Sequence, residues 1–379
     1  MNKPLKILHT EAAMEMGGQE IYIYRHMHCM RACGHQVQLL CQPGSRLAPL
    51  ARAAGFEVTT LRMGGPWRLL TGIWKVYRLA RRQHFDVVNT TSRRDTLIAA
   101  SAARLAGVPL VVRSRHLMSA VNSLLTYTVL PHRVITVSRF VGTLLAHYGV
   151  PAVRIGVVPP VAPPPPWLQH DADRLAHLQQ VRHEVRAELS LDTDAIVVGC
   201  VAVLRAPKGH AALFEAIAPL CRADPRLHLV VVGDGEPMMG RLRALRARLG
   251  LDAQVHLLGY RDDACRLMSG FDVFALATER EAAGTVFVEA AQAGLPVVAT
   301  RVGGVPEMVL DGINAVLVPP GDVPALRDAL RALVDHPERR AALGQASWQW
   351  MQGAHAFTET SQATRTEHYY YQWLKEMRK

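Results

Sequence analysis

The sequence has few cysteines, and none of them forms a recognisable metal site or redox pair. Six cysteines are scattered through 379 residues without a CxxC motif. Cys29 and Cys33 would share one face of a helix, but two ligands do not complete a zinc site. We therefore expect reduced, packed thiols in a cytoplasmic protein, and we predict no bound metal.

Long hydrophobic runs are also missing. No stretch of 18 or more apolar residues occurs, so we expect no membrane-spanning helix. The N-terminal stretch MNKPLKILHTEAAM lacks the long apolar core of a secretory signal. A GxGxxG motif is absent after the first apolar run, which argues against a nicotinamide-dependent dehydrogenase.

Charge of one sign is in excess: the formal net charge is +11, and arginine predominates over lysine. Such a surface suits nucleic acid, an anionic membrane surface or an anionic substrate. No basic stripe with interleaved aromatic residues appears, so we do not expect nucleic-acid binding. An anionic membrane surface and an anionic substrate both remain as alternatives. A third alternative is a basic surface that is simply solvated.

Short apolar runs alternate with helical stretches in the first part of the chain. This βαβα pattern predicts a parallel sheet covered by helices on both faces. The predicted strands are 5–10, 37–42, 85–91, 109–116 and 133–138, and the predicted helices are 18–33, 67–84, 94–106 and 139–147.

The proline-rich run VVPPVAPPPPW (157–167) interrupts the pattern, because proline suits neither a helix interior nor a central strand. A second alternating series follows. Its predicted strands are 195–204, 227–235, 255–260, 273–278, 296–301 and 315–320, and its predicted helices are 209–223, 237–250, 285–294, 305–310 and 322–345.

The fold class is therefore α/β, with two doubly wound domains facing each other across a cleft. We place the first domain at 1–160, a linker with its leading helix at 161–190, and the second domain at 191–356. The aromatic-rich C-terminal helix, within 357–379, is expected to return to the first domain, although packing on the second domain is the simpler alternative. Ligands of such sheets bind beyond the carboxyl ends of the strands.

The stretch EREAAGTVFVEAAQAG (279–294) holds two glutamates on either side of a strand-to-helix turn. We expect Glu281 on the loop and the helix start at Gly284–Thr285. The first backbone N–H groups of that helix, at Thr285, Val286 and Phe287, would offer a seat for phosphate.

Glu289 lies just over one turn into the same helix, where a carboxylate can accept two hydrogen bonds from a ribose. Glu281, outside the helix, can bind hydroxyls on the far side of the phosphates. The alternative for both residues is structural, with a solvated loop glutamate and a favourable first-turn glutamate.

Three further segments follow predicted strands at the same edge. Arg205 and Lys208 in LRAPKGH can neutralise a diphosphate, and Gly233 in GDGE marks a tight turn near the nucleotide. In the first domain, Gly17 and Gly18 leave room for a ligand. Solvated cations and ordinary turns are the simpler alternatives.

His116 closes the segment RSRH, again directly after a predicted strand. A lone histidine is more often a packing residue than a ligand. Its position at the ligand-binding edge favours a functional role.

Taken together, these motifs resemble the family-4 retaining glycosyltransferases, which have the GT-B fold. The resemblance rests on E-x7-E followed by EAAQAGLPVVAT, and on MGGQE, CGHQV, GVPLVVRSRH, VITVSRFV, APKGH, VVGDGE and GGVPEMV in the family's order. One departure is Val203, which stands where the family often has an arginine. The resemblance covers nearly the whole chain.

The resemblance implies a role for each candidate residue. Glu281 would contact the donor sugar, Glu289 the ribose, Lys208 with Arg205 the diphosphate, and His116 the transferred sugar. The backbone N–H groups of Gly284, Thr285 and Val286 would lie near the phosphates, and Gly17 and Gly18 would make room for the donor.

The resemblance further implies a metal-independent, retaining transfer from a UDP- or GDP-linked sugar, with no other cofactor. The segment 91–116 resembles that of relatives that build lipopolysaccharide or other surface glycans. Arginines 93, 94, 113 and 115 would then meet an acidic glycan or glycolipid acceptor, or the anionic inner face of the membrane, where peripheral contact is expected. The alternative is a GT-B scaffold without catalysis.

Overall fold

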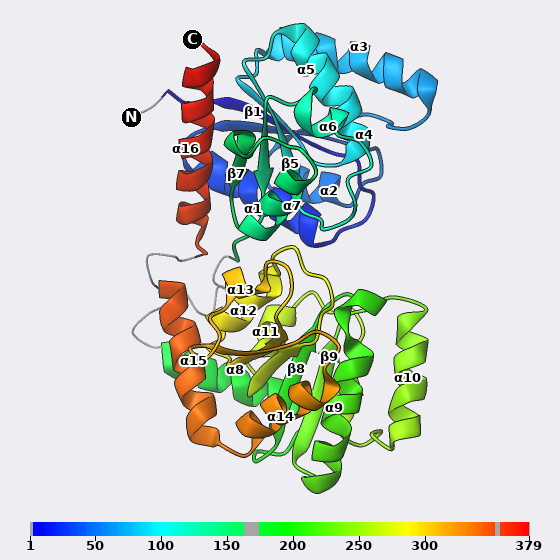
Figure 1. The fold of residues 1–379 in the computed structure, drawn as a ribbon, viewed down its shortest axis with the longest axis vertical. Helices are drawn as coiled ribbons and strands as arrows, with labels where there is room; N and C mark the ends of the chain where they lie inside the picture. The colour runs from blue at the N-terminus through cyan, green and yellow to red at the C-terminus, as the bar shows by residue number, and fades with distance from the viewer. Residues whose placement is uncertain (1–2, 163–173, 353–356, 379) are drawn as a thin grey trace. The chain divides into compact units, whose positions relative to one another are not determined.

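The computed structural model describes residues 3–162, 174–352 and 357–378, and it divides the chain into two compact units (Figure 1). Unit 1 consists of Met1–Val161 and Phe357–Lys379, and unit 2 of Ala162–Ala356. Each unit is built on one parallel sheet with helices on both faces, which confirms the predicted α/β class with two doubly wound domains.

Unit 1 has a seven-stranded sheet in the order β3-β2-β1-β4-β5-β6-β7 within the described residues. Its strands are β1 (Lys6–Glu11), β2 (Gln36–Cys41), β3 (Glu57–Thr60), β4 (Val87–Thr90), β5 (Leu110–Arg115), β6 (Arg133–Thr136) and β7 (Ile155–Val157). The chain reverses its direction of travel across the sheet between β3 and β4, so β1 and β4 become neighbours. In such sheets that reversal marks the ligand-binding edge.

Alternate side chains of these strands face two different helical layers. Leu8 and Val88 enter an apolar core beneath α3 and α5, whereas His9 and Asn89 point to the layer of α1 and α16. The helical segments of unit 1 are α1 (Gly18–Ala32), α2 (Leu47–Ala53), α3 (Pro66–Gln83), α4 (Arg93–Asp95), the π-helix η1 (Thr96–Ala100), α5 (Ser101–Ala106), α6 (Leu125–Thr128), α7 (Arg139–His147), the 3-10 turn η2 (Ala152–Arg154) and α16 (Glu359–Met377).

Helix α16 is held in unit 1 by buried aromatic side chains. The Nδ2 of Asn89 on β4 donates a 2.9 Å hydrogen bond to the hydroxyl of Tyr370, which is fully buried. Gly156 on β7 leaves space for Trp373, because a Cβ there would lie 2.9 Å from the indole ring. The C-terminal segment therefore completes one layer of unit 1.

Unit 2 repeats the pattern with a six-stranded sheet in the order β10-β9-β8-β11-β12-β13 within the described residues. Its strands are β8 (Ile196–Val201), β9 (Leu227–Val232), β10 (Val255–Leu257), β11 (Val273–Leu276), β12 (Val297–Thr300) and β13 (Ala315–Val318). Its helices are α8 (Arg174–Glu188), the 3-10 turn η5 (Ala206–Lys208), α9 (His210–Ala223), α10 (Met238–Leu249), α11 (Ala264–Met268), α12 (Thr285–Gln292), α13 (Val305–Met308), α14 (Val323–Val334) and α15 (Pro337–Gln352).

Several predicted elements differ from the structure. The single helix expected at 322–345 is wrong: α14 ends at Val334 and α15 begins at Pro337, where a proline ring fits a first helical turn but not an interior. The helix expected at 94–106 contains the π-helix η1 in its middle. Strands β3 and β7 and helix α2 were not predicted, and the proline run at 163–167 lies outside the described residues.

Candidate active site

The loop that carries Glu281 is tied to the loop that carries Lys208. The hydroxyl of Thr278, just beyond β11, donates a 3.0 Å hydrogen bond to the carbonyl oxygen of Pro207. The backbone N–H of Glu279 donates to the same oxygen over 2.8 Å. Because β8 and β11 are neighbouring parallel strands, these bonds bring two distant sequence segments to one point on the sheet edge.

Lys208 and Glu281 form an ion pair at this point. The Nζ of Lys208 donates a 2.6 Å hydrogen bond to Oε2 of Glu281, and the two side chains are 26% and 13% exposed. Gly209 makes the close approach possible: its φ is +69°, and a Cβ there would lie 1.8 Å from the carbonyl oxygen of Ala277. A half-buried, charge-assisted pair therefore stands where an anionic ligand would meet the edge.

Helix α12 begins at Thr285, as predicted, directly after Gly284 with φ +94°. A Cβ on Gly284 would lie 2.5 Å from the ring of Phe287, so this turn requires glycine. The N–H of Phe287 donates to the carbonyl oxygen of Gly284 over 3.1 Å, so the expectation that this N–H is free for a phosphate is wrong. The N–H groups of Thr285 and Val286 have no bonded acceptor among the described residues, and they remain the candidate phosphate donors.

The other candidates of unit 2 lie on the same edge. Glu289 is half-buried in the second turn of α12. Arg205 is exposed where the chain leaves β8. Gly233 follows β9 with φ +146°, and a Cβ there would lie 1.9 Å from the carbonyl oxygen of Ala202. That contact alone gives Gly233 a structural reason to be glycine.

In unit 1, Gly17 and Gly18 stand between β1 and α1. The N–H of Gly17 donates a 2.8 Å hydrogen bond to Oε2 of Glu20, which orders the start of the helix. Neither glycine has a positive φ, and a Cβ on Gly18 would have no heavy atom within 4 Å. The fold itself therefore leaves open space at Gly18.

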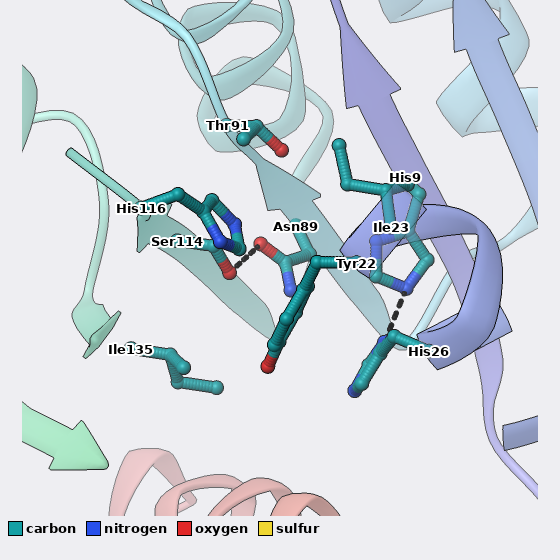
Figure 2. Close-up of a pocket in the computed structure, with 9 residues that line it drawn as sticks. All are labelled: His9, Tyr22, Ile23, His26, Asn89, Thr91, Ser114, His116 and Ile135. Carbon is teal, nitrogen blue, oxygen red and sulfur yellow. Dashed lines mark hydrogen bonds between the residues drawn. The ribbon is translucent and has the colours of Figure 1, made fainter. Parts of the chain in front are cut away.

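His116 follows β5 and lines a small pocket whose walls come from β1, α1, β4, β5 and β6 (Figure 2). Its ring packs edge-on against Tyr22, with 4.5 Å between the ring centroids. Burial and the neighbouring His26 lower the pKa of His116 to about 3, so the imidazole is neutral at pH 7. Its Nε2 is buried without a hydrogen-bond partner among the described residues.

Two further histidines form a chain of hydrogen bonds behind this pocket. Figure 2 shows His9 bonded to His26, and the distance from Nε2 of His9 to Nδ1 of His26 is 3.2 Å. The Nε2 of His26 lies 3.0 Å from the hydroxyl of Thr366, which itself donates to the carbonyl oxygen of Gln362. Because that hydroxyl proton is already used, His26 must donate from Nε2 and His9 must donate to His26.

The expectation for two of the four arginines is wrong. Arg113 is 3% exposed and Arg115 is 8% exposed, and both are occupied within unit 1. Arg113 donates to the carbonyl oxygen of Thr126, and Arg115 donates to the Tyr127 hydroxyl over 2.7 Å. These residues fix the segment after β5, whereas Arg93 and Arg94 are exposed.

Two family models match the chain and together cover most of it. The model described as glycosyl transferases group 1 matches residues 181–350, and the model described as Glycosyltransferase Family 4 matches residues 16–164. The chain belongs to the family-4 glycosyltransferases.

Curated relatives of this chain are named for different glycans. The chain is 32% identical over 232 residues to the GDP-mannose-dependent alpha-(1-6)-phosphatidylinositol monomannoside mannosyltransferase of Mycolicibacterium smegmatis, covering 56% of this chain and 58% of that protein. It is 32% identical over 168 residues to the lipopolysaccharide core biosynthesis glycosyltransferase LpsE of Rhizobium meliloti, covering 44% and 48%. The chain spans about half the length of the curated relatives it matches.

Solved structures show the same fold. A crystal structure of Anabaena Alr3699/HepE in complex with UDP has a TM-score of 0.84 at 22% identity, covering 97% of this chain and all of that one. Among the described residues of this chain, no group of three or more His, Cys, Asp or Glu side chains is placed to hold a metal ion. None of its described helices has both the length and the apolar character needed to cross a bilayer.

The sequence interpretation missed an acidic group at the carboxyl end of β1. Glu11 accepts hydrogen bonds from the N–H groups of Ala12 and Ala13 and from the Gln19 side chain. Burial and the nearby Asp95 raise the pKa of Glu11 to about 8. A signal was present, because a glutamate directly follows the apolar run KILHT at the ligand-binding edge.

Proposed function

We propose that this glycosyltransferase moves a sugar from a UDP- or GDP-linked donor to a glycan or glycolipid acceptor. The observation that carries the proposal is the Lys208–Glu281 ion pair, placed beside the N-terminus of α12. An ammonium, unpaired helix N–H groups and a carboxylate at one edge match the phosphates and the hydroxyls of a nucleotide sugar.

Each residue has a defined task in this proposal. Lys208 and Arg205 neutralise the diphosphate and the charge that develops on it as the glycosidic bond breaks. The N–H groups of Thr285 and Val286 bind phosphate oxygens, and Glu281 orients the sugar. The transfer retains the anomeric configuration in this proposal. It needs no metal, because the cationic side chains and the helix N-terminus supply the positive charge.

Glu289 binds the ribose in this proposal, and unit 1 supplies His116 to the transferred sugar. Neutral imidazole suits that task, since it donates or accepts a hydrogen bond without adding charge. Gly17 and Gly18 make room for the donor in this proposal. The space at Gly18 is open, whereas a Cβ on Gly17 would lie 3.3 Å from Oε2 of Glu20.

The acceptor is proposed to be a lipopolysaccharide or another surface glycan, met at the anionic face of a membrane. Two relatives support this class, since one is named for a phosphatidylinositol mannoside and the other for a lipopolysaccharide core. The exposed Arg93 and Arg94 add positive charge to unit 1.

A thermal-shift panel with UDP, GDP, ADP, CMP and NAD tests the donor site. A nucleotide at about 100 times its dissociation constant adds about 2.7 kcal/mol to the stability, which a melting curve resolves. We expect one nucleoside diphosphate to raise the melting temperature, and Lys208→Met to abolish the rise. Arg222→Met, at an exposed position on α9, is the matched control.

An activity assay distinguishes a catalytically active enzyme from a GT-B scaffold that only binds the nucleotide. We expect hydrolysis or transfer of the matching nucleotide sugar in the presence of a chelator, and its loss in Glu281→Gln but not in Glu279→Gln, an exposed neighbour. Nucleotide binding without turnover on any glycan acceptor would favour the scaffold. A shift with NAD alone would overturn the proposal.

A further inference from the structure

Helix α3 of unit 1 has one face that belongs to the core and one that does not. Its buried residues are Gly72, Val76, Leu79 and Ala80. Val76, Leu79 and Ala80 belong to the apolar cluster beneath β1 and β4, so the orientation of the helix about its own axis is fixed. The opposite face is consequently held outward.

Large apolar side chains occupy that outward face. Trp67 is 80% exposed, Leu70 63% and Trp74 56%. Their spacing of three and four residues confines them to an arc of about 60° on the helix. Tryptophan is rarely left so exposed on a soluble surface, and a contiguous apolar stripe marks a surface that binds something.

The rest of the outward face is cationic. Arg68, Lys75, Arg78, Arg81 and Arg82 flank the stripe, and all five are exposed. No aspartate or glutamate occurs between residues 66 and 83. The guanidinium of Arg78 lies 4.8 Å from the ring centroid of Trp74, so charge and aromatic surface are interleaved. The expectation from the sequence that no such basic, aromatic surface occurs is therefore wrong, because the helix brings together residues that are three and four positions apart.

The beginning of the helix lies near the ligand-binding edge of unit 1. Only residues 61–65 separate α3 from β3, so Trp67 stands at the carboxyl ends of the parallel strands. Gly18 and His116 follow strands at that same edge. Figure 1 shows α3 along the outer side of unit 1, next to α5.

We propose that the outward face of α3 docks this protein onto an anionic bilayer, with Trp67, Leu70 and Trp74 inserted among the headgroups and the five cations on the lipid phosphates. A helix with exposed tryptophans and a basic polar face is the form that lies in a membrane interface. A second copy of this chain is a poorer occupant, because two α3 helices would bring like charges together.

Docking through α3 sets the ligand-binding edge of unit 1 at the level of the headgroups. A lipid-linked acceptor would then reach His116 by diffusing in two dimensions. This consequence for sugar transfer rests on the proposed function, whereas the docking itself does not.

Co-sedimentation of the full chain with vesicles tests the proposal. We expect binding to vesicles of phosphatidylglycerol and phosphatidylcholine, and little binding to phosphatidylcholine alone. The double variant Trp67→Ser with Trp74→Ser should weaken binding by more than about tenfold. Its matched control, Val153→Ser with Leu175→Ser, removes two apolar side chains elsewhere that are at least as exposed, and it should bind normally.

A charge series tests the cationic half of the surface. Removing Lys75, Arg81 and Arg82 by Gln substitution should weaken binding by about hundredfold, since each cation near an anionic surface contributes about fivefold. The control removes three exposed arginines from α10 of unit 2, namely Arg241, Arg243 and Arg248, and should lose far less.

Three results would overturn the proposal: no binding of the wild type to anionic vesicles, equal binding by the tryptophan variant, or a solution dimer that the tryptophan variant dissociates. The nucleotide-induced rise in melting temperature should be the same in wild type and α3 variants. Conversely, Glu281→Gln should bind vesicles like wild type, so the docking and the sugar transfer can fail separately.

Discussion

The ammonium of Lys208 lies 2.6 Å from Oε2 of Glu281, although 72 residues separate them in the chain. The two charges neutralise each other when no ligand is bound. A diphosphate would have to share Lys208 with this carboxylate, and the carboxylate would repel it. The pair therefore weakens the binding of a bare nucleotide, while Glu281 remains available to hydroxyls of a sugar.

We accordingly predict that Glu281→Gln binds the free nucleoside diphosphate several-fold more tightly than wild type, yet transfers sugar at least about a hundredfold more slowly. Removing one negative charge at about 4 Å in a half-buried site contributes on the order of 1 kcal/mol or more to anion affinity. Isothermal titration and a transfer assay measure the two effects. Equal or weaker nucleotide binding in the variant would show that the pair does not oppose the phosphates.

The glycine before α9 gives a second prediction. Gly209→Ala should destabilise the protein by clearly more than Gly250→Ala. Both positions have a positive φ, +69° and +67°, which costs about 1 kcal/mol for alanine. Only Gly209 would also place its Cβ 1.8 Å from the carbonyl oxygen of Ala277, whereas Gly250 has open space.

Denaturant midpoints of the two alanine variants measure the difference, and nucleotide affinity provides a second readout. Moving the Ala277 backbone displaces the loop that leads to Glu281, so Gly209→Ala should lose nucleotide binding as well. Gly250→Ala should keep it. Equal free energies of unfolding in the two variants would mean that the loop after Ala277 moves aside at little cost. The close backbone approach at Gly209 would then not fix the position of Lys208.

The sequence predicted most strands and the start of α12 because these features depend on local patterns. Buried parallel strands appear as unbroken apolar runs, and a glycine followed by a helical stretch marks the turn at Gly284. Strand β3, by contrast, has the sequence EVTT and lies at the edge of the sheet. It contains no apolar run from which a strand could be predicted. Strand β7 is only three residues long.

Contacts between distant segments could not be predicted in the same way. Arg113 and Arg115 lie on β5, which leads to the ligand-binding edge as the sequence predicted. The segment after β5 folds back over them, and their guanidinium N–H groups donate to Thr126 and Tyr127 of that segment rather than to a ligand. The sequence likewise assigned separate tasks to Lys208 and Glu281. Their direct pairing follows from strand order in the sheet, which a one-dimensional pattern does not contain.

The buried titratable groups of unit 1 predict a maximum of stability near pH 6.5. Burial lowers the pKa of His9 to about 4 and of His116 to about 3, and it lowers that of His26 as well. Below pH 6.5 the unfolded chain takes up protons that the folded state refuses, so stability falls by about 1.4 kcal/mol per pH unit for each histidine.

Glu11 acts in the opposite direction. Its pKa is raised to about 8 from an ordinary value of 4.5, so the folded state keeps a proton that the unfolded state has lost. Stability should therefore fall as the pH rises from about 6.5 to 8, where the histidines no longer titrate. Urea midpoints across this range measure the curve. Glu11→Gln should flatten its alkaline side and steepen its acid side between about pH 4.5 and 6.5, because the opposing effect of Glu11 spans both. A wild-type urea midpoint that rises steadily up to pH 8 would contradict the opposing effects assigned to the histidines and to Glu11.

The last prediction concerns the anchoring of α16. Tyr370→Phe removes the hydroxyl that accepts from Nδ2 of Asn89, while Oδ1 of Asn89 still accepts from the Ser114 hydroxyl. The amide is buried, so its donor would be left without a partner and the variant should lose about 1–3 kcal/mol. Tyr371→Phe is the matched control, because its hydroxyl donates to the Lys3 carbonyl oxygen at the surface and water can replace it. We expect a loss below about 1 kcal/mol there, and equal losses in the two variants would show that the Asn89 bond does not hold α16 in place.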